Sequence, residues 1–396
     1  MFSRRVPSDH SANRLSAAIE RRRAAGAPLL DLTESNPTRC GFARDEEALR
    51  AALASPDSLR YEPHPQGLRS AREAVAGYYA DRGVSVSPDE LFLTTGTSEA
   101  YADVFKLLAD PGDEVLVPTP GYPLLDVLTR LEAVRLVPYA LRLGATGWVV
   151  DEEHVRSCIS TRTRAIVVVS PNNPTGSYLK PREREELSAL CRRFDCALIV
   201  DEVFSDYASG EHAGRVATTA GNRDALTFTL NGLSKLVGLP QVKLGWIHVG
   251  GPADQAAAAR ERLAFITDAF LSVSAGVQHA AARIIGSRGP VQEQIRHRVD
   301  GNEAELKRLL AGLASCRVLP REGGWYSVVE MPPAIADEDF AVDLLEAEGV
   351  LVHPGYFYDF AAGSYLVVSL LPPAADFREG ASLLVRRLLA QVPSVV

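Results

Sequence analysis

Short apolar runs alternate with helical patterns between about Leu91 and Val249. In chain order the runs are LFLTT, EVLVP, VRLVPY, AIVVVS, ALIVDE, ALTFTL and LGWIHV. Between them, SEAYADVFKLLA follows a Gly-Thr turn and PREREELSALCRRF opens with proline and acidic residues, as helices do at their N-termini. Alternation of strands with helices is typical of a mostly parallel sheet covered by helices on both faces. The pattern therefore predicts a large α/β domain with a mostly parallel, seven-stranded sheet.

The pattern changes after about Arg288. A long amphipathic helix, QEQIRHRVDGNEAELKRLLAGLA, is followed by GGWYSVVEM, by a second helix through DFAVDLLEAEG, and by VLVHPG and YLVVSLL. This order predicts a smaller α+β domain. We expect three parts: an N-terminal segment of residues 1–45 that packs with the small domain, a large domain of residues 46–287, and a small C-terminal domain of residues 288–396.

Composition and charge narrow the function. The 396 residues are 46% hydrophobic and 23% charged, enough for a large core and two domains. The net charge of −8 has both signs interspersed and no basic block, so we do not expect nucleic acid as a partner. The first residues carry no apolar leader, and no apolar run is long enough to cross a bilayer, which predicts a cytoplasmic protein without membrane contact.

Cysteines and the common motifs indicate neither a disulfide framework nor a metal site. The five cysteines are odd in number and the closest pair is spaced C-x4-C, so we expect reduced thiols. The histidines are scattered, and H-E-x-x-H is absent. The dinucleotide motif G-x-G-x-x-G, the P-loop and the esterase motif G-x-S-x-G are absent as well.

One lysine stands in an unusual setting. Lys235 lies in NGLSKLVGLPQVKLGW, between two predicted strands, with Ser234 beside it and otherwise mainly apolar residues and glycine around it. An ammonium group in a low-dielectric site is destabilised, so its pKa falls and the free amine can attack a carbonyl carbon to form a Schiff base. The ordinary alternative for a single lysine is a side chain that reaches solvent from a loop. The neighbouring motifs are therefore needed to distinguish a lysine that forms a Schiff base from one that reaches solvent.

An acidic residue ends one of the predicted strands. Asp201 follows an apolar run in LIVDEVFSDY, where a buried carboxylate needs a cationic partner to stay ionised. A protonated pyridine nitrogen is such a partner, and its pairing with an aspartate makes pyridoxal phosphate an electron sink. Alternatively, Asp201 and Glu202 cap the next helix from the end of the strand.

Three turns offer groups that suit a phosphate and an aromatic ring. In LFLTTGTSEAY, the backbone N–H groups of Gly96, Thr97 and Ser98 would face a dianion at the positive end of a helix, although an ordinary helix cap explains the same residues. In PTPGYPLL, Tyr122 is placed to lie over an aromatic ring. In SPNNPTGSY, Asn173 sits on a rigid turn whose Asn-Pro bond can be cis. Turn chemistry alone explains both residues equally well.

In their order along the chain, these segments resemble the class I/II aminotransferase family of fold-type I pyridoxal-phosphate-dependent enzymes. The resemblance runs from DLTESNPT and YEPHPQGLRSAREAVAGYY through TTGTSEAY, PGYP, NNPTG, DEVFSDY and SKLVGLP to VHPG, so it covers nearly the whole chain. Each motif is weak by itself, and the shared order carries the resemblance. It implies the fold of these enzymes, pyridoxal 5'-phosphate bound by the large domain, and a homodimer with shared active sites.

The resemblance also implies roles for single residues. Lys235 would form the internal aldimine and then act as the proton-shuttling base, with Asp201 on the pyridine nitrogen. Tyr122 would lie on the ring face, and Asn173 near the phenolic oxygen and the substrate. The groups near the phosphate would be Gly96, Thr97, Ser98, Ser234 and Lys243, while Tyr61 would reach the phosphate of the neighbouring subunit.

Three positions near the implied cofactor depart from the family pattern. Phe204 stands where the family has a tyrosine bonded to the phenolic oxygen, so that hydrogen bond is missing unless Tyr207 or another donor replaces it. Gly232 stands where the family often has a phosphate-binding serine. Lys243 replaces an arginine and supplies its charge without the bidentate fork. We therefore expect weakened or altered phosphate binding.

The largest departure concerns the substrate. Val367, in GSYLVVSLL, takes the place of the family's arginine that binds the substrate α-carboxylate, and the next arginine is Arg378. A charged hydrogen bond of roughly 1.5–3 kcal/mol is thereby lost. Either Arg39, Lys180 or a residue of the partner subunit holds an ordinary amino acid, or the substrate carries no free carboxylate beside its amine. Four aromatic residues belong either to a wall of the site or to the core: Trp325, Tyr326, Tyr356 and Tyr358.

The sequence therefore predicts a pyridoxal-phosphate-dependent aminotransferase that moves an amino group from an amino acid or amine to a 2-oxo acid. The alternative is a lyase, a β- or γ-replacement enzyme or a cyclising enzyme on the same fold, because the same carbanion supports each and Val367 replaces the usual arginine. A scaffold protein without catalysis is the third reading. The joint presence of Lys235, Asp201, Asn173 and Tyr122 argues against it.

Overall fold

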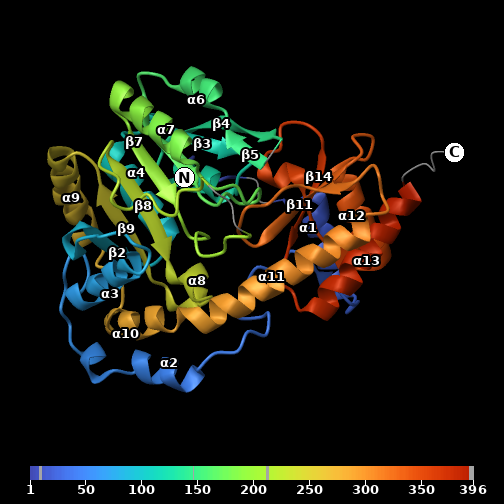
Figure 1. Ribbon diagram of the computed structural model, residues 1–396, viewed down its shortest axis with the longest axis horizontal. Helices are drawn as coiled ribbons and strands as arrows, with labels where there is room; N and C mark the ends of the chain where they lie inside the picture. Colours follow the sequence, from blue (N-terminus) through green and yellow to red (C-terminus); the bar gives the residue numbers. More distant parts are fainter. Residues whose placement is uncertain (9–10, 146, 211–213, 392–396) are drawn as a thin grey trace.

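A computed structural model describes residues 1–8, 11–145, 147–210 and 214–391. A part built on a large sheet lies beside a smaller part, and one long helix, α11, runs along both (Figure 1). The helices are α1 Arg14–Ala24, α2 Glu46–Leu53, α3 Arg69–Ala80, α4 Thr97–Leu108, α5 Leu124–Leu131, α6 Glu152–Cys158, α7 Pro181–Phe194, α8 Leu233–Leu236, α9 Ala253–Asp268, α10 Ala275–Gly286, α11 Arg288–Leu310, α12 Asp337–Glu348 and α13 Ala374–Gln391. The strands are β1 Leu30–Asp31, β2 Leu91–Thr94, β3 Glu114–Thr119, β4 Arg135–Gly144, β5 Gly147–Val150, β6 Thr163–Val169, β7 Ala197–Asp201, β8 Thr227–Gly232, β9 Gly245–Gly250, β10 Arg317–Val318, β11 Tyr326–Met331, β12 Val350–Leu351, β13 His353–Pro354 and β14 Ser364–Ser369.

The large sheet contains all seven predicted strands and one more. Its order is β2-β9-β8-β7-β6-β3-β4-β5. The pairs formed by β3, β4, β6, β7 and β8 are parallel, whereas β9 is antiparallel to both of its neighbours and β5 is antiparallel to β4. The prediction of seven strands is therefore one short. The missing strand, β5, extends the sheet by folding back on β4, and its four residues, GWVV, show neither alternation nor a longer apolar run in the sequence.

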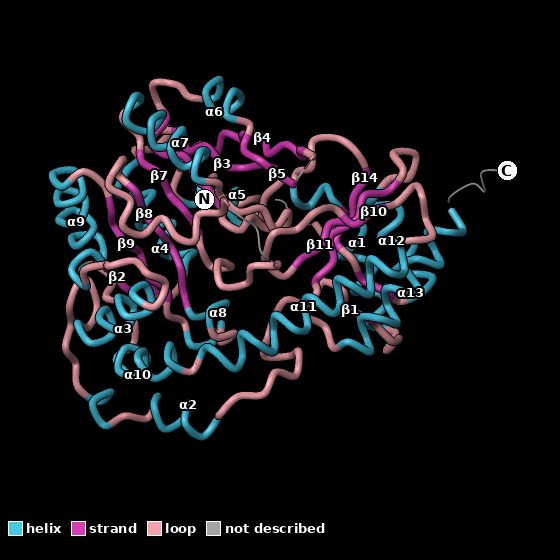
Figure 2. Tube along the Cα trace, viewed as in Figure 1, coloured by secondary structure: helices cyan, strands magenta, loops and turns pink. Residues whose placement is uncertain are grey.

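Helices cover both faces of this sheet (Figure 2). Alternate residues of a strand point to opposite faces. In β7, Ala197 and Ile199 pack with α4, α5 and α9, whereas Leu198 and Val200 pack in the core that includes α7. All five residues of β7 are buried, which explains its continuous apolar run. The predicted α/β arrangement is confirmed.

The strand directions bring the loops that hold the candidate residues to one edge of the sheet. Strands β3, β6, β7 and β8 are mutually parallel, and β2 has the same direction because it is antiparallel to β9. Gly96, Tyr122 and Asn173 follow the carboxyl ends of β2, β3 and β6. Asp201 is the last residue of β7, and Lys235 lies in α8, directly after β8. Ligands of open α/β sheets bind at this edge.

The smaller part contains a four-stranded sheet, β10-β11-β14-β13, flanked by α12, α13 and α11. Strand β1 pairs in parallel with β12, and Arg14 of α1 forms an ion pair with Asp339 of α12 at 2.6 Å. Residues near the N-terminus thus contact the C-terminal part. Helix α11 also contacts the large part, where its Gln292 side chain donates to the carbonyl of Leu236. The domain boundaries after residues 45 and 287 stay a prediction.

Across the described ranges, no helix is long and apolar enough to cross a membrane.

Candidate active site

A cavity of about 270 Å³ lies at the carboxyl edge of the large sheet. Seven of the residues predicted to hold the cofactor line it: Thr97, Ser98, Tyr122, Asn173, Asp201, Ser234 and Lys235. They come from loops that are far apart in the chain. The strand directions described above bring them together.

Lys235 extends its amine into this cavity from the four-residue helix α8. Burial lowers the pKa of the amine, while the charge of Asp201 opposes that shift. Its Nζ atom lies 5.6 Å from the ring centroid of Phe204 and 5.3 Å from that of Trp325. A lysine amine held in such surroundings is the nucleophile that a Schiff base requires.

Asp201 ends β7 and lies at the same cavity. Burial raises the pKa of its carboxyl to about 6, although the Val203 N–H, which donates to it at 3.1 Å, and the nearby Tyr101 hydroxyl counteract the shift. No helix follows directly, so Asp201 is not a helix cap. Glu202 points elsewhere, because its carboxylate accepts hydrogen bonds from Thr218 and Thr219.

The start of α4 offers free N–H groups to an anion. The residue that precedes the helix is Gly96, which has no side chain to cap it, and Thr97 and Ser98 of the first turn line the cavity. A Cβ atom at Gly96 would lie 3.9 Å from Nζ of Lys243, so this ammonium group sits beside the helix start. Ser234 lines the same cavity. Positive charge and free N–H groups at a helix N-terminus suit a phosphate.

Two glycines allow the backbone to approach this helix start. A Cβ atom at Gly245 would lie 2.8 Å from Cα of Gly96, and one at Gly232 would lie 2.9 Å from the carbonyl oxygen of Leu244. Neither position has room for a side chain without a backbone shift. Glycine at position 232, where the resemblance leads one to expect serine, thus has a steric reason in this chain.

Asn173 presents an unpaired oxygen to the cavity. The residue is 8% exposed, and its Oδ1 atom has no hydrogen-bond partner in the part of the chain that the structure describes. The Asn173–Pro174 bond is cis. The side chain interacts with the Tyr326 hydroxyl, which also bonds to Ser35, and burial raises the pKa of that phenol to about 12. Tyr122 also lines the cavity and is half exposed.

Tyr61 lies away from this cavity in its own chain. Its side chain is 82% exposed and lines a different cavity, of about 200 Å³, together with Glu99 and Asp103. The family resemblance assigns it to the site of a neighbouring subunit, and that role stays a prediction.

The cations considered as substrate anchors lie outside the cavity lining. Val367 is buried in β14, opposite Val328 of β11. Lys180 is paired with Glu322, and Arg378 is exposed beside Glu305. Arg39 lies four residues beyond Ser35, which lines the cavity, and its exposed side chain is 3.6 Å from Glu34.

The four aromatic residues named in the sequence lie in different places, and only one of them lines the cavity. Tyr326 lines the cavity, and Trp325 is buried directly behind Lys235. Tyr358 is buried and bonds to His353, while Tyr356 is more exposed and bonds to Glu338. Tyr207 does not replace the missing phenol, because its hydroxyl donates to the backbone carbonyl of Lys235 at 2.6 Å.

Several lining residues, Tyr101 and Ser35 among them, had no predicted role, whereas Tyr326 was one of the aromatic residues expected either at the site or in the core. Tyr101 is four residues after Thr97 on α4, so helical spacing could have placed it on the cavity face. Ser35 and Tyr326 reach the cavity only through the contact between the large and small parts of the chain. No local pattern indicates such a contact.

The residues present fit pyridoxal phosphate. A buried amine, a carboxylate, an anion-binding helix start, an aromatic side chain and an unpaired amide oxygen surround one cavity. On an open sheet covered on both faces, this set defines a fold-type I pyridoxal-phosphate enzyme.

Comparison with known proteins agrees with this class of enzyme. The family model "Aminotransferase class I and II" matches residues 27–374, so the chain belongs to that family. It is 30% identical over 363 residues to the glutamate-pyruvate aminotransferase AlaA of Escherichia coli K12, a match covering 89% of this chain and 88% of the relative. It is 32% identical to the aspartate/prephenate aminotransferase of Thermus thermophilus, over 91% of each chain. The crystal structure of an Escherichia coli aminotransferase has a TM-score of 0.86 and 25% identity, over 98% of both chains.

The chain is a pyridoxal-phosphate-dependent aminotransferase, as the resemblance implied. The relatives named above are aminotransferases, and nothing favours the lyase, replacement or cyclising alternative.

Proposed function

We propose that Lys235 carries the cofactor covalently and moves the proton during transfer of an amino group from an amino acid to a 2-oxo acid. The observation that carries this assignment is the shared cavity of the Lys235 amine and the Asp201 carboxylate, with Tyr122 and Asn173 around them. When bound, pyridoxal phosphate supplies the electron sink that stabilises the carbanion formed at the substrate carbon.

The residues of the chain supply the nucleophile and base and bind the cofactor. The lowered pKa of Lys235 keeps a free amine available as nucleophile and general base. Ionised Asp201 would hold the proton on the pyridine nitrogen. Tyr122 would pack on the ring, and the free amide oxygen of Asn173 would be available to the ligand. The start of α4, with Ser234 and Lys243, would bind the phosphate.

We propose that the donor is an amino acid and the acceptor a 2-oxo acid, as the names of the alanine and glutamate-pyruvate aminotransferases among its relatives suggest. Since Val367 is buried and Lys180 is paired with Glu322, we assign the carboxylate contact to Arg39. Its exposed guanidinium lies on the same loop as Ser35 and has one carboxylate neighbour, Glu34, at 3.6 Å. A modest displacement from Glu34 would free it for the substrate.

Absorbance spectra with a donor panel test the reaction. The protein loaded with pyridoxal phosphate is mixed with alanine, glutamate, aspartate and simple amines, and a 2-oxo acid is then added. We expect the cofactor band to change with an amino acid and to return with the 2-oxo acid. A Lys235→Ala variant that retains full transamination would show that the assignment of Lys235 is wrong.

In the same assay, the Arg39→Gln variant tests whether the substrate is an amino acid whose carboxylate binds Arg39 or an amine without a free carboxylate. Loss of a charged hydrogen bond of roughly 1.5–3 kcal/mol should raise the KM for amino acids about 10-fold to 100-fold and leave that for simple amines unchanged. An unchanged KM for amino acids would remove Arg39 as the anchor.

We further propose a cytoplasmic homodimer. The free thiols of all five cysteines support a reducing compartment. The position of Tyr61, exposed and outside the lining of the cavity of its own chain, supports a site completed by a second subunit.

A further inference from the structure

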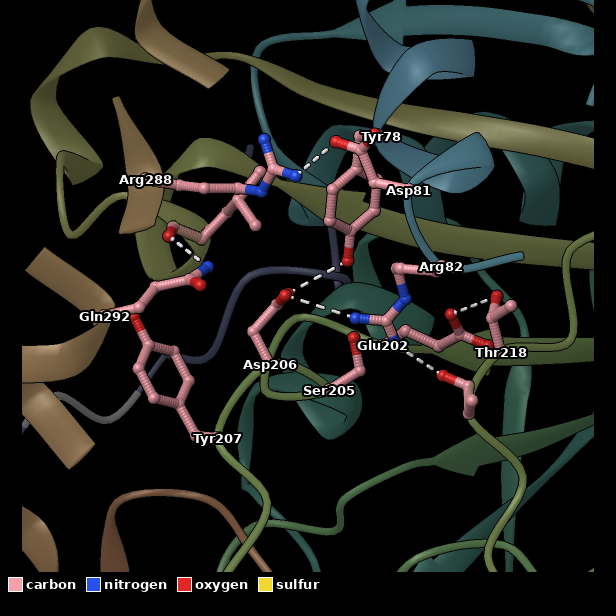
Figure 3. Close-up of polar contacts among 12 residues, drawn as sticks. Tyr78, Asp81, Arg82, Glu202, Ser205, Asp206, Tyr207, Thr218, Arg288 and Gln292 are labelled. Atoms are coloured by element: carbon pink, nitrogen blue, oxygen red, sulfur yellow. Dashed lines mark hydrogen bonds and ion pairs between the residues drawn. The ribbon is translucent and has the colours of Figure 1, made fainter. Parts of the chain in front are cut away.

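The helix that carries Lys235 is too short to hold itself in place. Helix α8 has four residues, and isolated helices of this length are unstable in water. Side chains from other elements bind its carbonyl groups instead. The Tyr207 hydroxyl donates to the carbonyl of Lys235 at 2.6 Å. The Gln292 amide, which is labelled in Figure 3, donates to the carbonyl of Leu236 at 2.9 Å.

Tyr207 also contacts the surroundings of the lysine amine. Its ring is buried and packs edge-on against Trp325, with 4.9 Å between the centroids. Trp325 in turn packs against Phe204 at 5.2 Å, and these two rings flank Nζ of Lys235. One aromatic cluster, Phe204, Tyr207 and Trp325, therefore contacts the lysine at its backbone and at its amine.

The loop that presents Tyr207 is anchored by a buried polar network (Figure 3). The carboxylate of Asp206 accepts hydrogen bonds from the Tyr78 hydroxyl at 2.9 Å and from Arg82 at 3.1 Å. The Tyr78 hydroxyl also accepts a bond from Asn231, the next-to-last residue of β8, the strand leading to Lys235. The loop after β7 and the end of β8 are thus tied to one group of α3, the Tyr78 hydroxyl.

We infer that Tyr207 is a positioning residue for Lys235: its hydroxyl, fixed through Trp325 and the Asp206 network, sets where the lysine amine stands in the cavity. This inference rests on the proposed function, in which Lys235 carries the cofactor. The carbonyl of Lys235 also accepts a bond from Gly238 N–H at 3.2 Å, so α8 keeps one bond there when the hydroxyl is removed. Loss of the hydroxyl should therefore loosen the lysine rather than unfold the helix.

The Tyr207→Phe variant tests this, because it keeps the ring and removes only the donor. Misplacement of a reacting group by about 1 Å can cost about 100-fold in rate, so we expect kcat to fall roughly 10-fold with KM changed less than about twofold. The rate at which Lys235 becomes linked to pyridoxal phosphate should also fall. Borohydride reduction followed by peptide mass spectrometry measures that linkage directly, and a pH titration of the cofactor band should show a shifted midpoint.

Tyr139→Phe is the matched control. The Tyr139 hydroxyl donates to the carbonyl of Val167 at 2.8 Å and is equally buried, but it does not contact α8. We expect a similar change in melting temperature and no change in linkage rate or titration midpoint. If Tyr207→Phe behaves like wild type in both measurements, or if Tyr139→Phe shows the same loss, the inference is wrong.

Two further outcomes are decisive. If wild-type protein forms no reducible link at Lys235, the proposed function fails and not the positioning alone. If Tyr207→Phe does not fold, Trp325→Phe replaces it, since this change loosens the ring that holds Tyr207. A linkage rate equal to wild type in that variant would overturn the inference.

Discussion

Asp201 and Lys235 experience opposite effects of the same burial. The cavity disfavours charge, so the pKa of the carboxyl rises to about 6 and the pKa of the amine falls. A neutral amine favours attack on the cofactor aldehyde, whereas the carboxyl has to be ionised to pair with a pyridinium. The cofactor-free site is therefore sensitive to acid just below neutral pH.

We expect cofactor affinity to decrease as pH falls through about 6. Because the pKa of Asp201 in the folded protein is about 6, its ionised fraction decreases up to tenfold per pH unit below that value. The Kd for pyridoxal phosphate should rise accordingly between pH 7 and pH 5. Fluorescence titrations of the cofactor-free protein across this range measure it.

The Asp201→Asn variant is the control for this pH dependence. It cannot ionise, so its Kd should be higher at neutral pH and change less with pH. The cofactor phosphate titrates in the same range, and the difference between wild type and variant isolates the carboxyl. Parallel pH curves for the two proteins would refute the assigned role of Asp201.

At the scale of elements, the start of α4 and the start of β9 are packed backbone to backbone. We expect Gly245→Ala to destabilise the protein by about 1–3 kcal/mol, the usual cost of overpacking, because its Cβ would lie 2.8 Å from Cα of Gly96. The displaced helix start should also weaken phosphate binding. Urea denaturation and cofactor titration of the same variant measure the two effects.

Gly301→Ala in α11 is the matched control. A Cβ atom there meets nothing within 4 Å, so alanine should stabilise the helix by about 0.5–1 kcal/mol. If both variants change stability equally, close approach is not the reason for glycine at position 245.

At the scale of the whole molecule, the proposed homodimer predicts complementation between damaged chains. The Lys235→Ala chain lacks the nucleophile, and the Tyr61→Ala chain lacks the group proposed to reach the neighbouring site. In a hybrid dimer, the Tyr61→Ala chain keeps its own Lys235 and receives Tyr61 from the other subunit. We expect activity to return when the two variants are refolded together.

Activity that stays at the sum of the separate variants would argue against a shared site. A size measurement on the same samples distinguishes a dimer with independent sites from a monomer.

The sequence alone determined the elements and the chemistry within each local motif. Apolar runs predicted seven of the eight strands of the large sheet, because most of these strands are buried on both faces and therefore have to be apolar. A lysine among apolar residues and an aspartate at a strand end were recognisable because charge in such places requires a reason. The order of these motifs was enough to indicate the family.

Only the tertiary structure decided how distant segments meet. Strand β5 needed β4 as a partner, and Ser35 and Tyr326 reach the cavity because the smaller part of the chain packs over the carboxyl edge of the sheet. The Tyr207 hydroxyl could have faced the cofactor or the backbone, and packing against Trp325 directs it to the carbonyl of Lys235. Contacts of this kind depend on distance and direction in space, which the local sequence pattern does not contain.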